Sequence, residues 1–417
     1  MSVAIEFRNV DILFSADASR TGAAAHKEAL AALDAGSTRT DIAAATRVVV
    51  GVANASLAVA RGEISVLMGL SGSGKSTLLR AANGLTPVSR GQVLIADGEA
   101  TIDVASCDRT TLRRIRRQRI AMVFQQFGLL PWRSVRDNVG FGLELRGEPA
   151  PNLKRIVEEK LALVGLSQWA DRAVGELSGG MQQRVGLARA FATDADVLLM
   201  DEPFSALDPL IRGKLQDELL SLQQRVRKTI LFVSHDLDEA LKLGDHISIL
   251  EGGRIVQTGT AEDIVLRPAD DYVAEFVHHM NPLTVLTGAM VMRPLAALAR
   301  DGDALWLDLA RRARLTLDAA GRPGGCTLDG APALLAPATE EGLGRAATSG
   351  APVTSAAVGS RGVALAPAEF SLLAIIRLCQ QTGLPVLLHD TQGRAIGACG
   401  EHEIVVALAG RRAEATH

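Results

Sequence analysis

The chain has 417 residues, enough for two or three domains that each bury a core. Hydrophobic residues make up 47% and charged residues 22%, so the chain is too apolar to be intrinsically disordered. The formal net charge of −3 and the aromatic content of 3% argue against nucleic-acid binding, which needs a basic surface and rings for base stacking.

The cysteines and the apolar segments suggest where the protein works. The four cysteines are scattered and form no CxxC pair, which argues against a disulfide framework or a zinc site and favours a reducing compartment. The apolar run Val48–Ala60 is far shorter than the ~20 residues that span a bilayer. Glu6 and Arg8 interrupt the N-terminus where a secretory signal needs an apolar stretch. We therefore expect a soluble, cytoplasmic protein that reaches a membrane only through a partner.

The first part of the chain predicts an α/β domain. Apolar stretches predict short strands of a mixed sheet at Val3–Phe7, Ser65–Met68 and Val93–Ile95. Between the first two lies a segment rich in Ala and Asp, about residues 17–47, with the spacing of a helical insert. From Gly62 to about Val256, apolar strands alternate with amphipathic helices, as a parallel α/β sheet requires.

The composition changes near residue 281. Ala, Gly, Pro and Thr dominate Gly321–Ser360, after which Glu369–Gln380 predicts a helix and Leu384–Leu388 a strand. We therefore predict one domain over residues 1–280 and a second over residues 281–417.

A glycine-rich segment predicts a phosphate-binding loop. Gly69–Thr77 fits the pattern GxxxxGK[ST] between the strand Ser65–Met68 and helical Leu78–Ala82. Glycines let backbone N–H groups converge on phosphate oxygens, while Lys75 neutralises the phosphates and the Ser76 hydroxyl binds Mg²⁺. The strand–loop–helix context disfavours the alternative of a simple turn before a helix. The predicted nucleotide ligands of this loop are Gly69, Ser71, Gly72, Ser73, Gly74, Lys75, Ser76 and Thr77.

Two adjacent carboxylates follow another apolar strand. Val197–Met200 predicts a buried strand, and Asp201 and Glu202 stand at its carboxyl end, where ligands bind in open α/β sheets. Asp201 is predicted to hold Mg²⁺, through water, and Glu202 to act as general base on the attacking water. Solvated acids at a strand end are the alternative, which the phosphate loop in the same chain disfavours.

A third motif connects the first two to a known family. The segment Leu177–Arg184 (LSGGMQQR) resembles the signature motif of ABC-type ATPases and opens an apolar helix. Ser178, Gly179 and Gly180 at that helix start supply donors for a γ-phosphate. The resemblance implies a P-loop NTPase fold with a mixed sheet and a helical subdomain at about residues 128–185. It also implies a head-to-tail homodimer, in which these donors contact the ATP of the opposite subunit.

Three further elements match this family in order. Gln125, after Val123 and Phe124, resembles its glutamine loop, which implies contact with Mg²⁺ and the γ-phosphate and movement with the permease. Ser205–Asp208 resembles the loop that crosses the dimer seam, and we assign Asp208 to the nucleotide site. His235 resembles the switch histidine that hydrogen-bonds the γ-phosphate. Alone it would more often be a structural residue, and its companions favour the catalytic role.

Two features need a choice between interpretations. The family stacks adenine on an aromatic residue shortly before the phosphate loop, and here only Phe7 and Phe14 are candidates. We assign Phe14, with core packing as the alternative. The arginine-rich segment Arg113–Arg119 is predicted to be a solvated helix before the strand Ile120–Phe124 rather than a nucleic-acid contact.

Longer stretches resemble one branch of the family, the ATPase subunits of quaternary-amine importers for glycine betaine, proline betaine or choline. The resemblance covers about residues 1–285, and the whole chain is most similar to a choline-type member. It rests on Met68–Gly74, Ser205–Arg212, Gln216–Leu219, Ser234–Ala240 and Arg267–Val273.

The partners follow from this resemblance. Aromatic rings cage quaternary ammonium groups, and one tyrosine and three tryptophans are too few for such a cage. We therefore expect an extracytoplasmic solute-binding protein to bind the amine, and this chain to lie peripherally on the cytoplasmic face of the inner membrane. Leu129–Arg133 is a candidate wall for a helix of the transmembrane permease; Trp132 is either part of that docking site or plain surface packing.

The end of the chain resembles a regulatory module. Leu384–Gly397, followed by helical Glu401–Leu408, resembles a CBS-type module, with a degenerate first copy in Pro282–Gly350. The resemblance implies control of transport by ionic conditions or by a nucleotide-like ligand. An inert stabilising tail is the alternative.

The sequence therefore predicts an ATPase that energises import, in which ATP joins two copies and hydrolysis releases them. Two other functions stay open: an importer for another solute, such as a sulfonate or an amino acid, and a soluble ABC-type ATPase acting on ribosomes or chromosomes. The family's soluble members resemble paired cassettes or cassettes split by coiled coils, and neither pattern is present here.

Overall fold

The computed structural model describes residues 2–15, 20–278, 283, 286–338 and 362–413. The chain divides into two compact units, Met1–Ile264 and Val265–His417, each of which is described by itself below. This division comes earlier in the chain than the boundary predicted near residue 281. Within the described residues, no helix combines the length and the apolar character needed to cross a bilayer.

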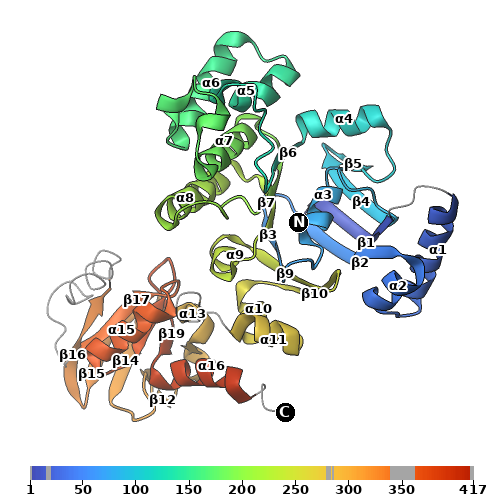
Figure 1. Cartoon of the computed structure of the whole chain (residues 1–417). Coiled ribbons are helices and arrows are strands. Elements are labelled where there is room, and N and C mark those ends of the chain that lie inside the picture. The colour runs from blue at the N-terminus through green and yellow to red at the C-terminus, as the bar shows by residue number, and fades with distance from the viewer. Residues whose placement is uncertain (1, 16–19, 279–282, 284–285, 339–361, 414–417) are drawn as a thin grey trace. The chain divides into compact units, whose positions relative to one another are not determined.

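Two sheets make up the first unit (Figure 1). The smaller one is antiparallel, with the order β2-β1-β4-β5. The strand predicted at Val3–Phe7 extends to Ser15, because bulges around Asn9, whose φ is +46°, let it continue through a bend. The strands are β1 (Val3–Ser15), β2 (Val48–Ala60), β4 (Arg90–Asp97) and β5 (Ala100–Asp103).

This small sheet corrects two expectations. The strands predicted at Val3–Phe7 and Val93–Ile95 do not join Ser65–Met68 in one mixed sheet but pair with each other. On its other side β1 pairs with β2, the apolar run Val48–Ala60, which was not predicted as a strand. Its glycine, alanines and asparagine lower its local strand propensity, and it forms because its alternate residues are buried against neighbouring elements.

The larger sheet has the order β10-β9-β3-β8-β7-β6. From β9 to β6 neighbouring strands are parallel, and only the edge strand β10 is antiparallel. The inner strands are buried on both faces, which explains their continuous apolar sequences. The strands are β3 (Ile64–Met68), β6 (Ile120–Val123), β7 (Val197–Asp201), β8 (Thr229–Val233), β9 (His246–Glu251) and β10 (Arg254–Gly259).

Helices connect these strands. Three of them, α5, α6 and α7, pack together as a helical group, drawn in green in Figure 1. Arg114 of α4 and Arg119, the residue that follows this helix, reach Asp97 at 2.7 Å, so arginines of this segment form ion pairs at the protein surface. The helices are α3 (Lys75–Ala81), α4 (Arg109–Gln118), α5 (Val135–Arg146), α6 (Ala150–Leu163), α7 (Gly179–Ala192), α8 (Pro209–Val226), α9 (Leu237–Leu243) and α10 (Ala261–Leu266).

Two helices, α1 (Arg20–Asp34) and α2 (Arg39–Thr46), occupy the segment between β1 and β2. They pack on these strands through their own apolar cluster, in which Leu33 and Ile42 are buried. Arg90 of β4 adds a polar anchor, because it bonds both to Asp34 of α1 and to buried Asp11 of β1. These contacts hold the two helices against the small sheet.

The second unit is built on a nine-stranded sheet of order β11-β19-β18-β17-β16-β15-β14-β13-β12. Its strands are β11 (Arg293–Pro294), β12 (Arg300–Asp301), β13 (Ala304–Trp306), β14 (Ala313–Leu317), β15 (Pro323–Leu328), β16 (Ala331–Pro337), β17 (Gly362–Pro367), β18 (Val386–His389) and β19 (Ala395–Cys399). Its helices are α11 (Asp271–His278), α13 (Gly288–Val291), α15 (Leu372–Thr382) and α16 (Glu401–Ala413).

The end of this unit runs strand, helix, strand, strand, helix, from β17 to α16. The strand predicted at Leu384–Leu388 begins instead at Val386, because Gly383 caps α15 with a φ of +65° and Leu384 bonds back to Thr382 in the turn. Before it, β12–β16 form an antiparallel meander where a degenerate first copy was predicted. Residues 339–361 of that region lie outside the described residues.

Candidate functional site

The parallel strands bring the predicted residues to one edge of the large sheet. The phosphate loop follows β3, and Asp201 ends β7 with Glu202 next to it. His235 follows β8, and Gln125 follows β6. Since β3, β8, β7 and β6 are adjacent and parallel, all four carboxyl ends meet at this edge.

The loop after β3 has a shape that only glycine permits. Gly69 and Gly74 have φ values of +136° and +101°. A Cβ atom on Gly69 would lie 2.1 Å from the Leu250 carbonyl oxygen, and one on Gly74 would lie 2.5 Å from that of Gly51. The hydroxyl of Ser73 is buried and has no hydrogen-bond partner within the described residues. The loop is therefore a tight backbone cradle with an unused polar group, as expected of a phosphate site.

Lys75 places a positive charge in this cradle. It is 6% exposed, and its Nζ donates to the carbonyl oxygens of Gly69 at 2.8 Å and Leu70 at 2.9 Å. Burial lowers the pKa of the ammonium group, and the charges of Glu202 and Asp201 oppose that shift. A buried cation held by neutral carbonyls is suited to an anionic ligand.

Next to Lys75, Ser76 and Asp201 form an oxygen pair. The Ser76 hydroxyl donates to Asp201 Oδ1 at 2.6 Å, and Asp201 is fully buried. Arg80 donates to Asp201 Oδ2 through Nε at 3.1 Å and Nη2 at 2.8 Å. Hydroxyl and carboxylate oxygens are ligands that Mg²⁺ prefers, so this pair fits the ion. Arg80 was missed from the sequence, although it lies one helical turn after Ser76 on α3.

Gln125 and His235 meet at the carboxylate of Glu202. Gln125 Nε2 donates to Glu202 Oε2 at 3.0 Å, and His235 Nδ1 lies 3.6 Å from the same oxygen. Glu202 has a φ of +49°, a conformation that is strained for a non-glycine residue. Its backbone is fixed, because its N–H donates to Val233 and its carbonyl accepts from buried Gln183 of α7 at 3.1 Å. Elements that are far apart in the sequence thus fix the position of the Glu202 carboxylate.

The backbone before His235 is held by a buried acid that sequence reasoning missed. Ser234 Oγ donates to Glu239 Oε2 at 2.5 Å, and Gln216 Nε2 donates to Glu239 Oε1 at 3.0 Å. Burial raises the pKa of Glu239, and these hydrogen bonds oppose the shift. Glu239 therefore positions the turn that carries His235. The available signal was an acid four residues after the histidine, next to Ala240 in an otherwise buried helix face.

The signature residues lie elsewhere in the unit. Ser178 caps α7 by accepting from Met181, and Asp208 caps α8 by accepting from Ile211. A Cβ on Gly180 would lie 3.0 Å from the Ala206 carbonyl oxygen, so the tip of α7 packs on the loop before α8. Within the described residues, no hydrogen bond joins Ser178, Gly179, Gly180 or Asp208 to the phosphate loop of the same chain.

Two of the predicted aromatic residues are exposed. Phe14 is 43% exposed at the end of β1, and its ring covers Gly51, the residue whose carbonyl faces Gly74. Phe14 is therefore one residue away from the phosphate loop. Trp132 is 77% exposed on a loop that buried Asn138 fixes through hydrogen bonds, so its ring faces solvent rather than packing on the surface.

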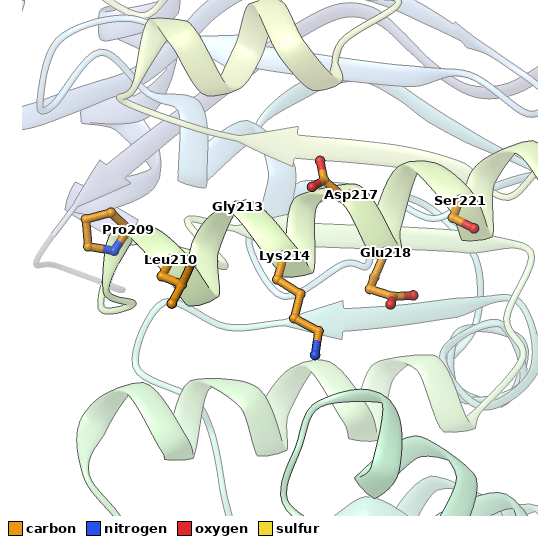
Figure 2. Close-up of a pocket in the computed structure, with 7 residues that line it drawn as sticks. All are labelled: Pro209, Leu210, Gly213, Lys214, Asp217, Glu218 and Ser221. Carbon is orange, nitrogen blue, oxygen red and sulfur yellow. The ribbon is translucent and has the colours of Figure 1, made fainter. Parts of the chain in front are cut away.

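A hollow of about 590 Å³ runs along α8 immediately after Asp208. Figure 2 shows the side chains of Leu210, Lys214 and Glu218 along this face. Leu210 is 82% exposed. None of the residues that line the hollow belongs to the predicted site, so it is separate from the cluster around Glu202.

Known proteins are similar to this chain in sequence and in fold. A family profile described as "ABC transporter" matches residues 52–205. The glycine betaine/carnitine transport ATP-binding protein GbuA of Listeria monocytogenes is 47% identical over 283 residues, 67% of this chain and 70% of that protein. The glycine betaine/proline betaine transport system ATP-binding protein ProV of Escherichia coli is 45% identical over 293 residues, 70% of each chain.

A solved structure agrees with these relatives. The ATP-binding cassette MJ0796, in a dimeric post-hydrolysis state bound to ADP and Pi, matches with a TM-score of 0.52 and 28% identity. The match covers 61% of this chain and 98% of that one. The chain therefore belongs to the family of ABC transporter ATP-binding proteins, and its first unit is an ATP-binding, ATP-hydrolysing cassette of the ABC fold.

Proposed function

We propose that this chain energises the import of a quaternary amine by hydrolysing ATP at the carboxyl edge of its large sheet. The observation that supports this most directly is the convergence on one edge of the Lys75 cation, the Ser76–Asp201 oxygen pair and the Glu202 carboxylate. Together they offer charge neutralisation, metal ligands and a base, which are the parts that phosphoryl transfer to water requires.

The residues at this edge of the sheet have different roles in binding and hydrolysing ATP. The Gly69–Thr77 loop and Lys75 bind the phosphates, and Phe14 stacks on the adenine. Ser76, Asp201 and Gln125 would hold Mg²⁺, which would neutralise charge that develops on the transferred phosphoryl group. Glu202 accepts the proton of the attacking water, and His235 donates a hydrogen bond to the γ-phosphate.

The signature residues require a second copy of the chain. In the part of the chain that the structure describes, no hydrogen bond joins Ser178, Gly179, Gly180 or Asp208 to the phosphate loop of their own chain. We infer that they complete the site of a partner copy, so that two ATP molecules lie between two head-to-tail subunits. The dimeric state of the similar cassette MJ0796 supports this arrangement. Hydrolysis would then separate the copies and drive the transmembrane subunits.

The transport partners follow from the relatives. Their names describe glycine betaine, carnitine and proline betaine transport. The choline transport ATP-binding protein OpuBA of Bacillus subtilis is 44% identical over 227 residues, a shorter match than those. We therefore propose a quaternary amine without choosing among these solutes. The solute itself would contact a solute-binding protein outside the cell and a transmembrane permease, not this chain.

We place the chain on the cytoplasmic face of the inner membrane, where exposed Trp132 on its rigid loop offers a docking point for a permease helix. The second unit, whose end we propose to be a CBS-like module, would regulate transport in response to ionic conditions or a nucleotide-like ligand. An inert stabilising role for this unit is the alternative.

Glu202→Gln tests the catalytic proposal. The variant should bind ATP as tightly as the wild type, hydrolyse it at least 100-fold more slowly, as expected for loss of a general base, and persist as a dimer with ATP. Asp238→Asn, which neutralises an exposed acid next to the site, is the matched control and should turn over normally. Fast hydrolysis by Glu202→Gln would overturn the assignment of the base.

Two further measurements separate the proposed transport role from its rivals. Co-purification of the chain with membrane subunits would exclude a soluble ABC-type ATPase of ribosomes or chromosomes. Binding of labelled choline and betaine to the partner solute-binding protein would identify the solute. Failure of both amines to bind would favour an importer for a different solute.

A further inference from the structure

The helical insert between β1 and β2 reaches the phosphate loop through one side chain. Arg39, the first residue of α2, donates from Nη1 to the carbonyl oxygen of Gly72 at 3.3 Å. We propose that Arg39 is a further nucleotide-binding residue, supplied by the insert, which contacts the phosphate chain of the bound nucleotide. This proposal rests on the proposed function, because it concerns the same loop.

The position of Arg39 is fixed by the packing of the insert. The preceding residue, Thr38, caps α2 by accepting from the N–H of Asp41 at 3.2 Å. Ile42, one turn further, is 1% exposed within the apolar cluster that α1 and α2 form with β1 and β2. The same β2 strand contains Gly51, which lies against Gly74 of the phosphate loop. The helix α2 and the phosphate loop therefore both pack against β2. The side chain of Arg39 extends from α2 to the phosphate loop.

The charge of Arg39 is not compensated by an acid. Within the described residues, its single bond is to the neutral carbonyl of Gly72, and no carboxylate pairs with it. Arg90, by contrast, anchors the same insert and is bonded to both Asp11 and Asp34. Arg90 is thus paired with carboxylates, whereas Arg39, beside the phosphate loop, has no carboxylate partner within the described residues.

The surroundings leave room for an anion at this point. A Cβ atom on Gly72 would meet no heavy atom within 4 Å, so the space beside this residue is open. A guanidinium group has five donors in a planar fork that matches phosphate oxygens, and it forms stronger bonds to charged than to neutral acceptors. Gly72 belongs to the loop that we propose holds the polyphosphate, so the guanidinium group of Arg39 lies beside the proposed phosphate site.

The test compares Arg39→Ala and Arg39→Lys with the wild type in the full chain, using a fluorescent ATP analogue with Mg²⁺. Arg39→Ala should bind roughly tenfold more weakly, the effect of one charge-assisted hydrogen bond, and Arg39→Lys should recover part of the loss. The affinity of Arg39→Ala should also depend less steeply on salt, because screening acts on a charge that the variant lacks. Removal of a charge that lies far from the bound phosphates would not change that slope.

Matched variants separate this proposal from the proposed function. Arg47→Ala removes the same charge from the exposed opposite end of α2 and should bind ATP normally. Lys75→Ala should lose binding. If Lys75→Ala binds poorly while Arg39→Ala matches the wild type in affinity and salt slope, the phosphate contact of Arg39 is wrong and the loop assignment stands. If Lys75→Ala also binds normally, the proposed ATP site itself fails.

Discussion

At the scale of single residues, the site depends on buried charges whose partners are mostly neutral. Lys75 is held by carbonyl oxygens, and Glu239 by a hydroxyl and an amide. Burial disfavours both charged forms, lowering the pKa of Lys75 and raising that of Glu239. Lys75 can recover this cost when an anion binds, whereas Glu239 lies behind the turn of His235 and is satisfied only by its protein partners.

The raised pKa of Glu239 predicts a pH dependence of stability. Above the unfolded carboxyl's ordinary pKa of 4.5, the folded state binds more protons than the unfolded state. The free energy of unfolding therefore falls as the pH rises from 4.5 through the raised folded pKa. Glu239→Gln cannot titrate and keeps an acceptor for Ser234, so its stability relative to the wild type should increase over that range.

Urea unfolding at a series of pH values measures this difference. Gln168→Leu, which changes an exposed side chain and removes no ionisable group, is the control, and its free energy of unfolding should depend on pH as that of the wild type does. If the free energy of unfolding of Glu239→Gln also shows the pH dependence of the wild type, the carboxyl of Glu239 titrates alike in the folded and unfolded states. The interpretation that burial raises its pKa is then wrong.

At the scale of elements, α7 connects the signature residues to the catalytic turn. Gln183 is 1% exposed, and its side chain donates to the Glu202 carbonyl at 3.1 Å and accepts from the Ala206 N–H at 3.0 Å. One side chain of this helix thus fixes both the residue proposed as base and the loop on which Gly180 packs. A displacement of α7 would therefore shift the backbone of Glu202.

Gln183→Leu should weaken this connection. The Ala206 N–H loses its side-chain acceptor, and the Glu202 carbonyl keeps only its hydrogen bonds from Ser205, so stability should fall by about 1 kcal/mol. The kcat for ATP hydrolysis should fall while KM changes little, because the phosphate loop is untouched. Gln168→Leu, the same change at an exposed glutamine, is the control. A variant that loses stability but keeps its kcat would limit Gln183 to a structural role.

The elements also show what sequence reasoning could and could not find. The phosphate loop and the acids after β7 were predictable, because each motif is local and the strand before it is uniformly apolar. The strand β2 was missed, since its residues acquire strand structure only by pairing with β1 across the helical insert. Arg39 and Gln183 were missed for a related reason: nothing in their local sequence indicates contacts with Gly72 or Glu202.

At the scale of the whole molecule, the chain contains two units with separate apolar cores. Leu67 is buried in the core of the first unit, and Leu387 in that of the second. No residue of the proposed ATP site belongs to the second unit. We therefore expect two transitions in a calorimetric scan, of which ATP with Mg²⁺ raises only the one that belongs to the first unit.

A pair of matched core variants assigns these transitions. Leu387→Ala should destabilise the second unit by about 2–5 kcal/mol, the usual cost of a cavity, and leave the ATP-sensitive transition where it is. Leu67→Ala should do the reverse, since both leucines are fully buried on strands of their own core. A single transition that both variants and ATP shift together would mean that the units unfold as one. The second unit could then influence the cassette through stability alone, and a regulatory role for it would need no ligand of its own.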